Sequence, residues 1–73
     1  MMSEQDFLMK MQEEILDTED EITMGTKLSD IEEWDSLAFV SFMAFAKMSG
    51  VTVDRTAVHE ADTVGNLYHL LGM

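Results

Sequence analysis

Cysteine and proline are both absent from this chain of 73 residues. Without cysteine the protein has no disulfides and no thiolate metal ligands, so any thiol chemistry requires a thiol supplied from outside the polypeptide. The lack of cysteine fits a cytoplasmic protein. Because proline is common in linkers, its lack fits one compact unit, and the length leaves room for a single domain over residues 1–73.

Basic residues are scarce, since four lysines and arginines stand against fifteen acidic residues and give a formal net charge of −11. This charge repels the phosphate backbone of nucleic acids and the headgroups of anionic membranes. It favours partner proteins with basic patches. No segment approaches the ~18 consecutive apolar residues of a transmembrane helix, so we expect a monomer that does not insert into membranes.

The acidic residues are unevenly distributed along the chain. Twelve of the fifteen lie in residues 1–35, whereas the span 36–53 contains none and carries a single charge, on Lys47. Electrostatic steering of partners is therefore expected from the first half of the chain, and chiefly from residues 17–35.

Apolar spacing predicts a first helix over residues 4–16, followed by a long connection. Phe7, Met11 and Ile15 recur every four residues, and Ser3 precedes the helix as an N-cap. In the connection over residues 17–35, the spaced apolar residues are expected to pack against the core. They are Ile22, Leu28, Ile31 and Trp34. The Ser29–Glu32 spacing predicts a short capped helical turn there.

A second helix is predicted from Asp35 or Ser36 to Ser49, with Gly50 ending it. Ten of the twelve residues 37–48 are apolar, so this helix is either central to the core or presents an apolar surface. Residues 51–53 are expected to form an extended connector.

Two further helices are predicted in the last third of the chain. Asp54 caps a short helix over residues 55–60, and Thr63 caps a last helix that ends at Gly72. The fold class is thus all-α: a small bundle of three main helices and one short helix, with a long loop between the first two.

The carboxylates and histidines do not form a recognisable metal site. A calcium loop beginning at Asp17 would place Ile22 where glycine is required and Leu28 where glutamate is required. His59 and His69 lie ten residues apart, which matches no zinc motif. We expect no metal site, and no enzyme, because a domain this small has little room for a substrate cleft.

Ser36 lies where the long connection meets the second helix. The simplest interpretation is that Asp35 or Ser36 is an N-cap. A hydroxyl at a helix N-terminus is exposed, however, and free N–H groups and the helix dipole would favour a phosphodiester attached to it. Asp35 would oppose that anion or share a bound Mg²⁺ with it.

The order of these features resembles that of an acyl carrier protein. The matching features are the apolar stripe of the first helix, the long acidic loop, Asp35-Ser36-Leu37 opening the second helix, the short third helix, and Thr63-Val64 opening the last. The resemblance covers residues 7–71.

The resemblance implies that Ser36 carries 4′-phosphopantetheine, transferred from coenzyme A by a separate Mg²⁺-dependent phosphopantetheinyl transferase. The terminal thiol of this arm would hold acyl intermediates as thioesters for acyl-transfer, ligase or synthase enzymes of one pathway. Asp35 and Leu37 would be recognised with Ser36. The acyl cavity would be lined by Val40, Phe42 and Leu67.

The second helix lacks the acidic residues that carriers of general fatty-acid synthesis present after the serine. We therefore expect a specialised carrier that docks through apolar contacts. The expected partner-binding residues are Ala38, Phe39, Val58, Glu32 and Glu33. Phe39 either is exposed as an anchor or packs on the loop around Trp34, and the sequence leaves both open.

Two alternatives remain open from the sequence. One is an aminoacyl or peptidyl carrier with the same arm, since Trp-Asp-Ser-Leu also occurs in such carriers. The other is a non-enzymatic helical adaptor in which Ser36 is no more than an N-cap.

Overall fold

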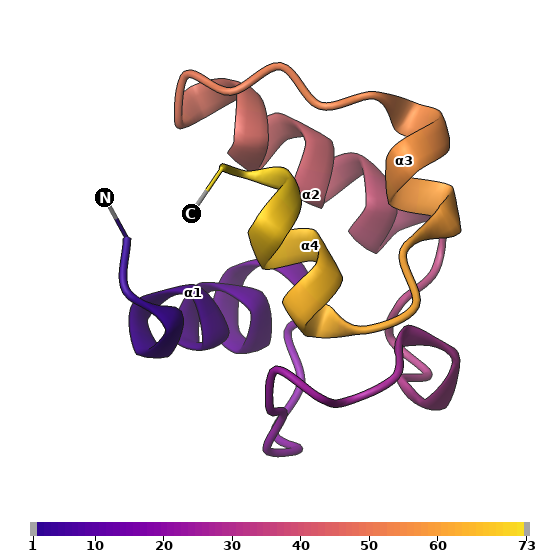
Figure 1. Ribbon diagram of the computed structural model, residues 1–73. Helices are drawn as coiled ribbons and strands as arrows, with labels where there is room; N and C mark the ends of the chain where they lie inside the picture. Colours follow the sequence, from indigo (N-terminus) through magenta and orange to yellow (C-terminus); the bar gives the residue numbers. More distant parts are fainter. Residues whose placement is uncertain (1, 73) are drawn as a thin grey trace.

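The computed structural model describes residues 2–72, which form four α-helices and two short helical segments around one core (Figure 1). In chain order they are α1 (Glu4–Lys10), the π-helix η1 (Met11–Ile15), the 3₁₀-helix η2 (Leu28–Asp30), α2 (Ser36–Met48), α3 (Arg55–Glu60) and α4 (Val64–Leu70). Residues 2–72 contain no β-strand. The predicted all-α bundle is confirmed.

The first helix changes its winding half-way along. The Ser3 hydroxyl oxygen accepts a hydrogen bond from the Asp6 N–H at 3.1 Å, as the capping pattern predicts. After Lys10 the chain continues as the π-helix, and the Leu16 N–H reaches the Met11 carbonyl at 2.8 Å. Apolar residues four apart drift around an α-helix, which has 3.6 residues per turn. The π-helix has a wider turn, so Met11 and Ile15 can both stay buried on the same side.

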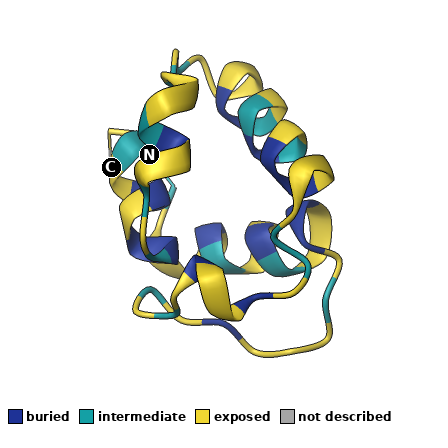
Figure 2. Cartoon of the chain, turned by 90° about the vertical axis from the view of Figure 1, so that its right-hand side faces the viewer, coloured by how far each residue is buried: buried dark blue, intermediate teal, exposed yellow. Residues whose placement is uncertain are grey.

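Helix α2 is both central and partly exposed, so both interpretations of its apolar composition hold. Its buried residues are Ala38, Phe39, Phe42 and Ala46, which recur mainly every four residues. Figure 2 shows that buried residues lie on the sides of the helices that face one another. Gly50 follows α2 with φ +81°, a conformation in which a side chain would be strained, and ends the helix where predicted.

The connection between η1 and α2 is attached to the core as expected. Ile22, Leu28 and Ile31 are buried and Trp34 is partly buried. The predicted short helical turn is present as η2, but Ser29 does not cap it, because Ser29 lies inside the turn. The residue before η2 is Lys27, which is held in an extended conformation by an antiparallel bridge to Thr63.

The last two helices begin and end close to their predicted bounds. The Asp54 carboxylate accepts from the Thr56 N–H at 2.9 Å, and residues 51–53 connect α2 to α3 without regular secondary structure. Thr63 and Asn66 form a reciprocal capping box at the start of α4. Gly72 has φ +79° and follows the end of that helix.

The core draws on every helix of the bundle. Its largest fully buried side chains are Phe7, Met11, Phe42, Val58, Val64 and Leu67. Phe7 packs against Tyr68 with ring centroids 5.2 Å apart. None of the helices within residues 2–72 has the length and apolar character needed to cross a bilayer.

Candidate functional site

Ser36 is the first residue of α2, and its side chain is exposed. The preceding Asp35 is the N-cap: its Oδ1 accepts from the Ala38 N–H at 3.0 Å. The Asp35 carbonyl accepts from the Phe39 N–H at 2.9 Å. The N–H groups of Ser36 and Leu37 have no carbonyl one turn before them in the helix, so they are left for solvent or for an anion.

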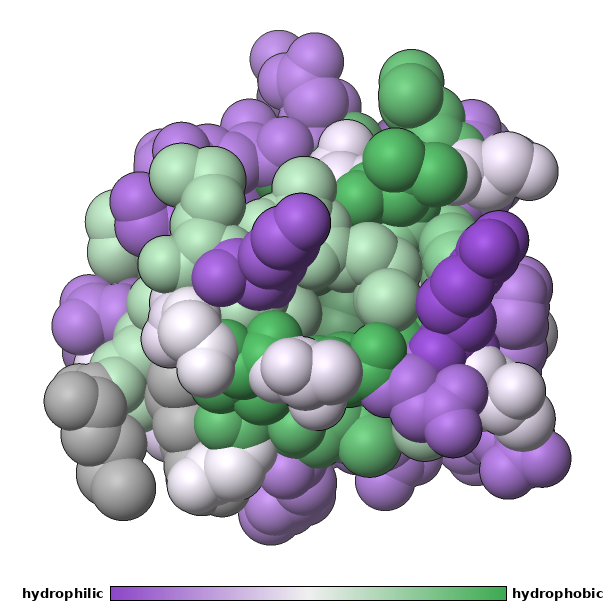
Figure 3. All heavy atoms as spheres, turned by 90° about the horizontal axis from the view of Figure 1, so that it is seen from above, coloured by the Kyte–Doolittle hydropathy of each residue, from purple (hydrophilic) through white to green (hydrophobic). Residues whose placement is uncertain are grey.

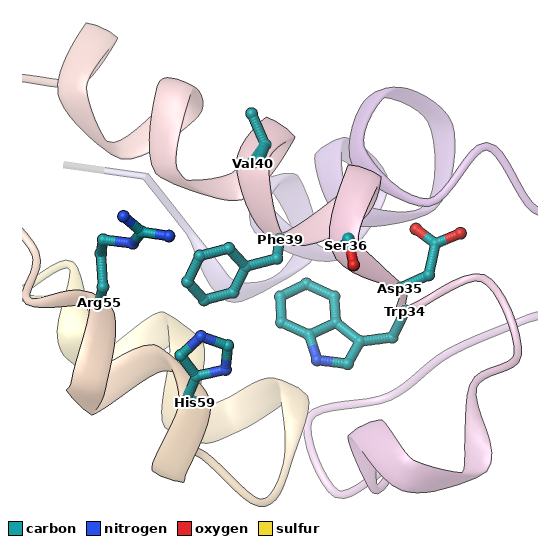
Figure 4. A pocket seen from close by; sticks show the side chains of 7 residues that line it. All are labelled: Trp34, Asp35, Ser36, Phe39, Val40, Arg55 and His59. Carbon is teal, nitrogen blue, oxygen red and sulfur yellow. The ribbon is translucent and has the colours of Figure 1, made fainter.

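An open cleft of about 400 Å³ lies beside Ser36, between the start of α2 and α3 (Figure 4). Its lining residues come from the end of the long loop, from α2 and from α3. They are Trp34, Asp35, Ser36, Phe39, Val40, Arg55 and His59. The cleft therefore combines aromatic walls with one cationic and one anionic side chain.

The Phe39 ring divides the cleft and is held by two side chains of α3. The His59 imidazole stacks on it with centroids 4.3 Å apart and an interplanar angle of 18°. The Arg55 guanidinium carbon lies 5.8 Å from the centroid of the same ring, within the range of a cation–π contact. Arg55 and His59 are four residues apart, so both project from one face of α3.

The charges of the cleft lie at opposite ends. In Figure 4 the Asp35 carboxylate points away from the Phe39–His59 pair, whereas the Arg55 guanidinium lies on the far side of Phe39 from Ser36. The ion pair found within residues 2–72 joins Lys10 to Glu14, so no carboxylate of that part of the chain pairs with Arg55.

The structure brings together the predicted attachment residues. Asp35, Ser36 and Leu37 are consecutive and exposed, with 74% of the Leu37 side chain accessible. Glu32 is exposed and Glu33 is partly buried on the turn just before them.

Three residues expected to contact partners are buried instead. Ala38 is 3%, Phe39 8% and Val58 1% exposed. These residues are therefore not accessible where α2 and α3 meet, and for Phe39 the packed alternative holds. Phe39 is not an exposed anchor; its stacking partner is His59.

The predicted cavity residues divide between the core and the surface. Phe42 and Leu67 are fully buried, as expected of cavity-lining residues. Val40 is 59% exposed and so lies outside the core, at the edge of the cleft. One turn after Ser36, it lies on the solvent side of α2 and points away from Phe39 (Figure 4).

Val40 also borders a second, more apolar groove of about 430 Å³. The other lining residues are Met43, Ala44, Lys47, Val51, Thr52 and Val53. Figure 3, which views the molecule from the top of Figure 1, shows many apolar side chains gathered on this face, with a hydrophilic side chain lying across them. The exposed part of α2 and the connector after it therefore form one apolar surface.

Trp34, Arg55 and His59 line the cleft, although no sequence motif marks them as site residues. The four-residue spacing of Arg55 and His59 on a predicted helix is a signal that they share a face. Their position against Phe39 depends on how α3 packs on α2, which no local pattern specifies.

Comparison with known proteins finds no matching family model, no matching curated sequence and no matching solved structure.

Proposed function

We propose that the protein is an acyl carrier, with 4′-phosphopantetheine attached to Ser36 and acyl intermediates held as thioesters on that arm. The observation that carries the proposal is the position of Ser36. Its hydroxyl is exposed at the first residue of a 13-residue helix, next to a cleft, in a chain that has no thiol of its own.

The residues at this position fit such a group. Asp35, not Ser36, caps α2, so the serine hydroxyl is not needed to hold the helix. The N–H groups of Ser36 and Leu37 and the positive end of the helix dipole favour a phosphodiester there. The Asp35 carboxylate is occupied in part by the Ala38 N–H, which reduces its repulsion of a neighbouring anion.

The attachment step is a phosphoryl-group transfer at the Ser36 hydroxyl oxygen. That oxygen would bond to the phosphorus that carries pantetheine in coenzyme A, and the bond from this phosphorus to adenosine bisphosphate would break. The serine proton would pass to a base of the transferase. When attached, the arm supplies the thiol that forms thioesters; Ser36 and its helix supply a fixed point of attachment.

Docking of partner enzymes would use the exposed apolar residues that follow Ser36. Leu37 and Val40 are 74% and 59% exposed, and no acidic residue lies between 36 and 53. The acidic loop, including Glu32 and Glu33, would steer basic partners towards this surface. This arrangement suits a carrier dedicated to one pathway, whose transferase and acyl-handling enzymes contact an apolar helix.

The test is to incubate the protein with coenzyme A, Mg²⁺ and a broad-specificity phosphopantetheinyl transferase and to measure its intact mass. We expect the wild type to gain the mass of one phosphopantetheine group and Ser36→Ala to gain none. Ser29→Ala is the matched control, because Ser29 is also exposed but lies in η2, and it should be loaded normally.

No gain in the wild type, or a gain that persists in Ser36→Ala, would overturn the carrier proposal. The chain would then be better explained as a helical adaptor without a prosthetic group. Circular dichroism of Ser36→Ala should match that of the wild type, since the Asp35 cap is retained.

A further inference from the structure

The cleft beside Ser36 contains a cation whose role the proposed function leaves unexplained. Arg55 is the single arginine of a chain with fifteen acidic residues. It is exposed, it forms no ion pair within residues 2–72, and it borders the cleft next to Ser36. In a chain with net charge −11, a cation without an acidic partner at a cleft is available to an anion from outside the chain.

We propose that Arg55 and His59 bind a carboxylate at the far end of the acyl group carried on Ser36, so that the cleft selects acidic cargo. This inference rests on the proposed function and names the class of its cargo. The guanidinium offers paired N–H donors that match the two oxygens of a carboxylate, and the imidazole one turn further along α3 adds another nitrogen.

The geometry separates the carboxylate from the phosphodiester of the arm. The Phe39 ring lies between Ser36 and Arg55 (Figure 4). A phosphodiester bonded to Ser36 would lie at the Trp34 end of the cleft, next to the α2 N-terminus, and the arm would fold back along the cleft to bring its far end to Arg55. The anion that meets Arg55 belongs to a more distant part of the tethered group.

Phe39 prepares the site in two ways. Its contact with the Arg55 guanidinium limits the orientations of that side chain without using its N–H donors. Its ring, with that of Trp34, gives the methylene groups of the cargo an apolar wall. The Asp35 carboxylate opposes an anion in the same cleft, but it points away from Phe39 and is hydrogen-bonded to the Ala38 N–H.

The test compares three loaded forms of the ¹⁵N-labelled protein: the free-thiol arm, a butyryl thioester and a succinyl thioester. Butyryl and succinyl have equal carbon chains and differ in the terminal carboxylate. Mass spectrometry first verifies loading. We expect the succinyl form, relative to the butyryl form, to shift the side-chain NMR signals of Arg55, His59 and the Trp34 indole N–H.

Two variants assign the effect. Arg55→Gln should abolish the shift between the succinyl and butyryl forms, and Arg55→Lys should restore part of it. Lys47→Gln removes a cation that lies outside this cleft and should leave the shift unchanged.

Identical spectra for the succinyl and butyryl forms would overturn the inference and leave the carrier proposal intact. A difference between the two forms that persists in Arg55→Gln would also overturn it. So would a free-thiol form whose Arg55 and His59 signals already match those of the succinyl form, since the phosphodiester would then be the source of the shift. If the protein cannot be loaded at all, the mass measurement overturns the proposed function and this inference with it.

Discussion

The backbone N–H of Gly65 donates a hydrogen bond to the carbonyl oxygen of Met24 at 2.8 Å. Two further bonds join the same segments: the Val64 N–H reaches the Thr26 carbonyl at 3.0 Å, and the Leu28 N–H reaches the Asp62 carbonyl at 2.9 Å. The long loop thus supplies acceptors for the first N–H groups of α4, which have no partner within the helix. Through these bonds α4 fixes the loop that leads to Ser36.

Replacing Gly65 by alanine should destabilise the fold, although alanine normally favours a helix. A Cβ at this position would lie 2.8 Å from the Met24 carbonyl oxygen, so the backbone of the loop or of α4 must move. We expect a loss of about 1–3 kcal/mol in the free energy of unfolding, as for other overpacked sites. Chemical denaturation measures it.

Gly25→Ala is the matched control. A Cβ there would meet its nearest atom, the Thr23 hydroxyl oxygen, at 4.0 Å, which is ordinary contact. Its unfolding free energy should change by less than ~0.5 kcal/mol. Equal stability of Gly65→Ala and Gly25→Ala would contradict the close approach of loop and helix.

Asp35 caps α2 and, under the carrier proposal, is recognised by the transferase; substitutions can separate these two roles. Asp35→Ala removes the acceptor of the Ala38 N–H and should cost about 1 kcal/mol of stability. Asp35→Asn keeps an acceptor oxygen and should remain near wild-type stability. Under the carrier proposal it should still be loaded more slowly, because the transferase would lose the charge next to Ser36. Loading at the wild-type rate would show that Asp35 is a cap alone.

Exposed Leu37 and buried Phe39 should respond differently to truncation. Leu37→Ala should leave stability within ~0.5 kcal/mol of the wild type. It should raise the transferase KM about tenfold if docking buries this leucine, since that burial contributes ~1.5–3 kcal/mol. Met48→Ala, at the other end of α2 and 89% exposed, should change neither quantity.

Phe39→Ala should instead lower stability by about 3 kcal/mol, because it empties a packed position and removes the stacking partner of His59. Any weaker loading of this variant would therefore reflect a disturbed fold. Unchanged stability would contradict the burial of Phe39.

The ion pair between Lys10 and Glu14, on the surface of the first helix, makes a contribution to stability that depends on pH. The hydrogen bond and the opposite charge of Glu14 raise the pKa of Lys10 above its ordinary value of 10.5. Because the pKa is raised by folding, the pair's contribution to stability is complete below the ordinary pKa and is lost as pH rises through the folded value. The effect is small, since both side chains are exposed.

Titration of the Lys10 ε-amino group by NMR should therefore give a pKa above 10.5, and Glu14→Gln should lower it. Glu60→Gln, which removes a carboxylate from α3, is the control and should leave it unchanged. A Lys10 pKa that does not respond to Glu14→Gln would contradict the pairing.

Local signals in the sequence were sufficient for most of the fold. Asp54 and Thr63 each combine a capping side chain with the start of an apolar pattern, so the beginnings of α3 and α4 could be predicted. The π-helix could not, because its winding depends on how Met11 and Ile15 reach the core. The Ser29–Glu32 cap failed because Lys27 pairs with Thr63, which is distant in sequence.

The candidate site was only partly predictable for a related reason. Ser36 could be located because it lies at a helix start that local capping specifies. In α2 nearly every residue is apolar, so the sequence does not distinguish the face that packs from the face that is exposed. For Phe39 the sequence leaves exposure and burial open, and for adjacent Val40 it does not reveal the exposed position; the positions of Arg55 and His59 depend on the packing of α3.

The most direct test of the carrier proposal is to locate the attached group after loading from coenzyme A. Trypsin, cleaving after Lys27 and Lys47, releases residues 28–47, which contain Ser29, Ser36 and Ser41. Tandem mass spectrometry of this peptide distinguishes the three hydroxyls. The proposal predicts that the phosphopantetheine mass lies on Ser36; its absence from the peptide, or its presence on another serine, would contradict the proposal.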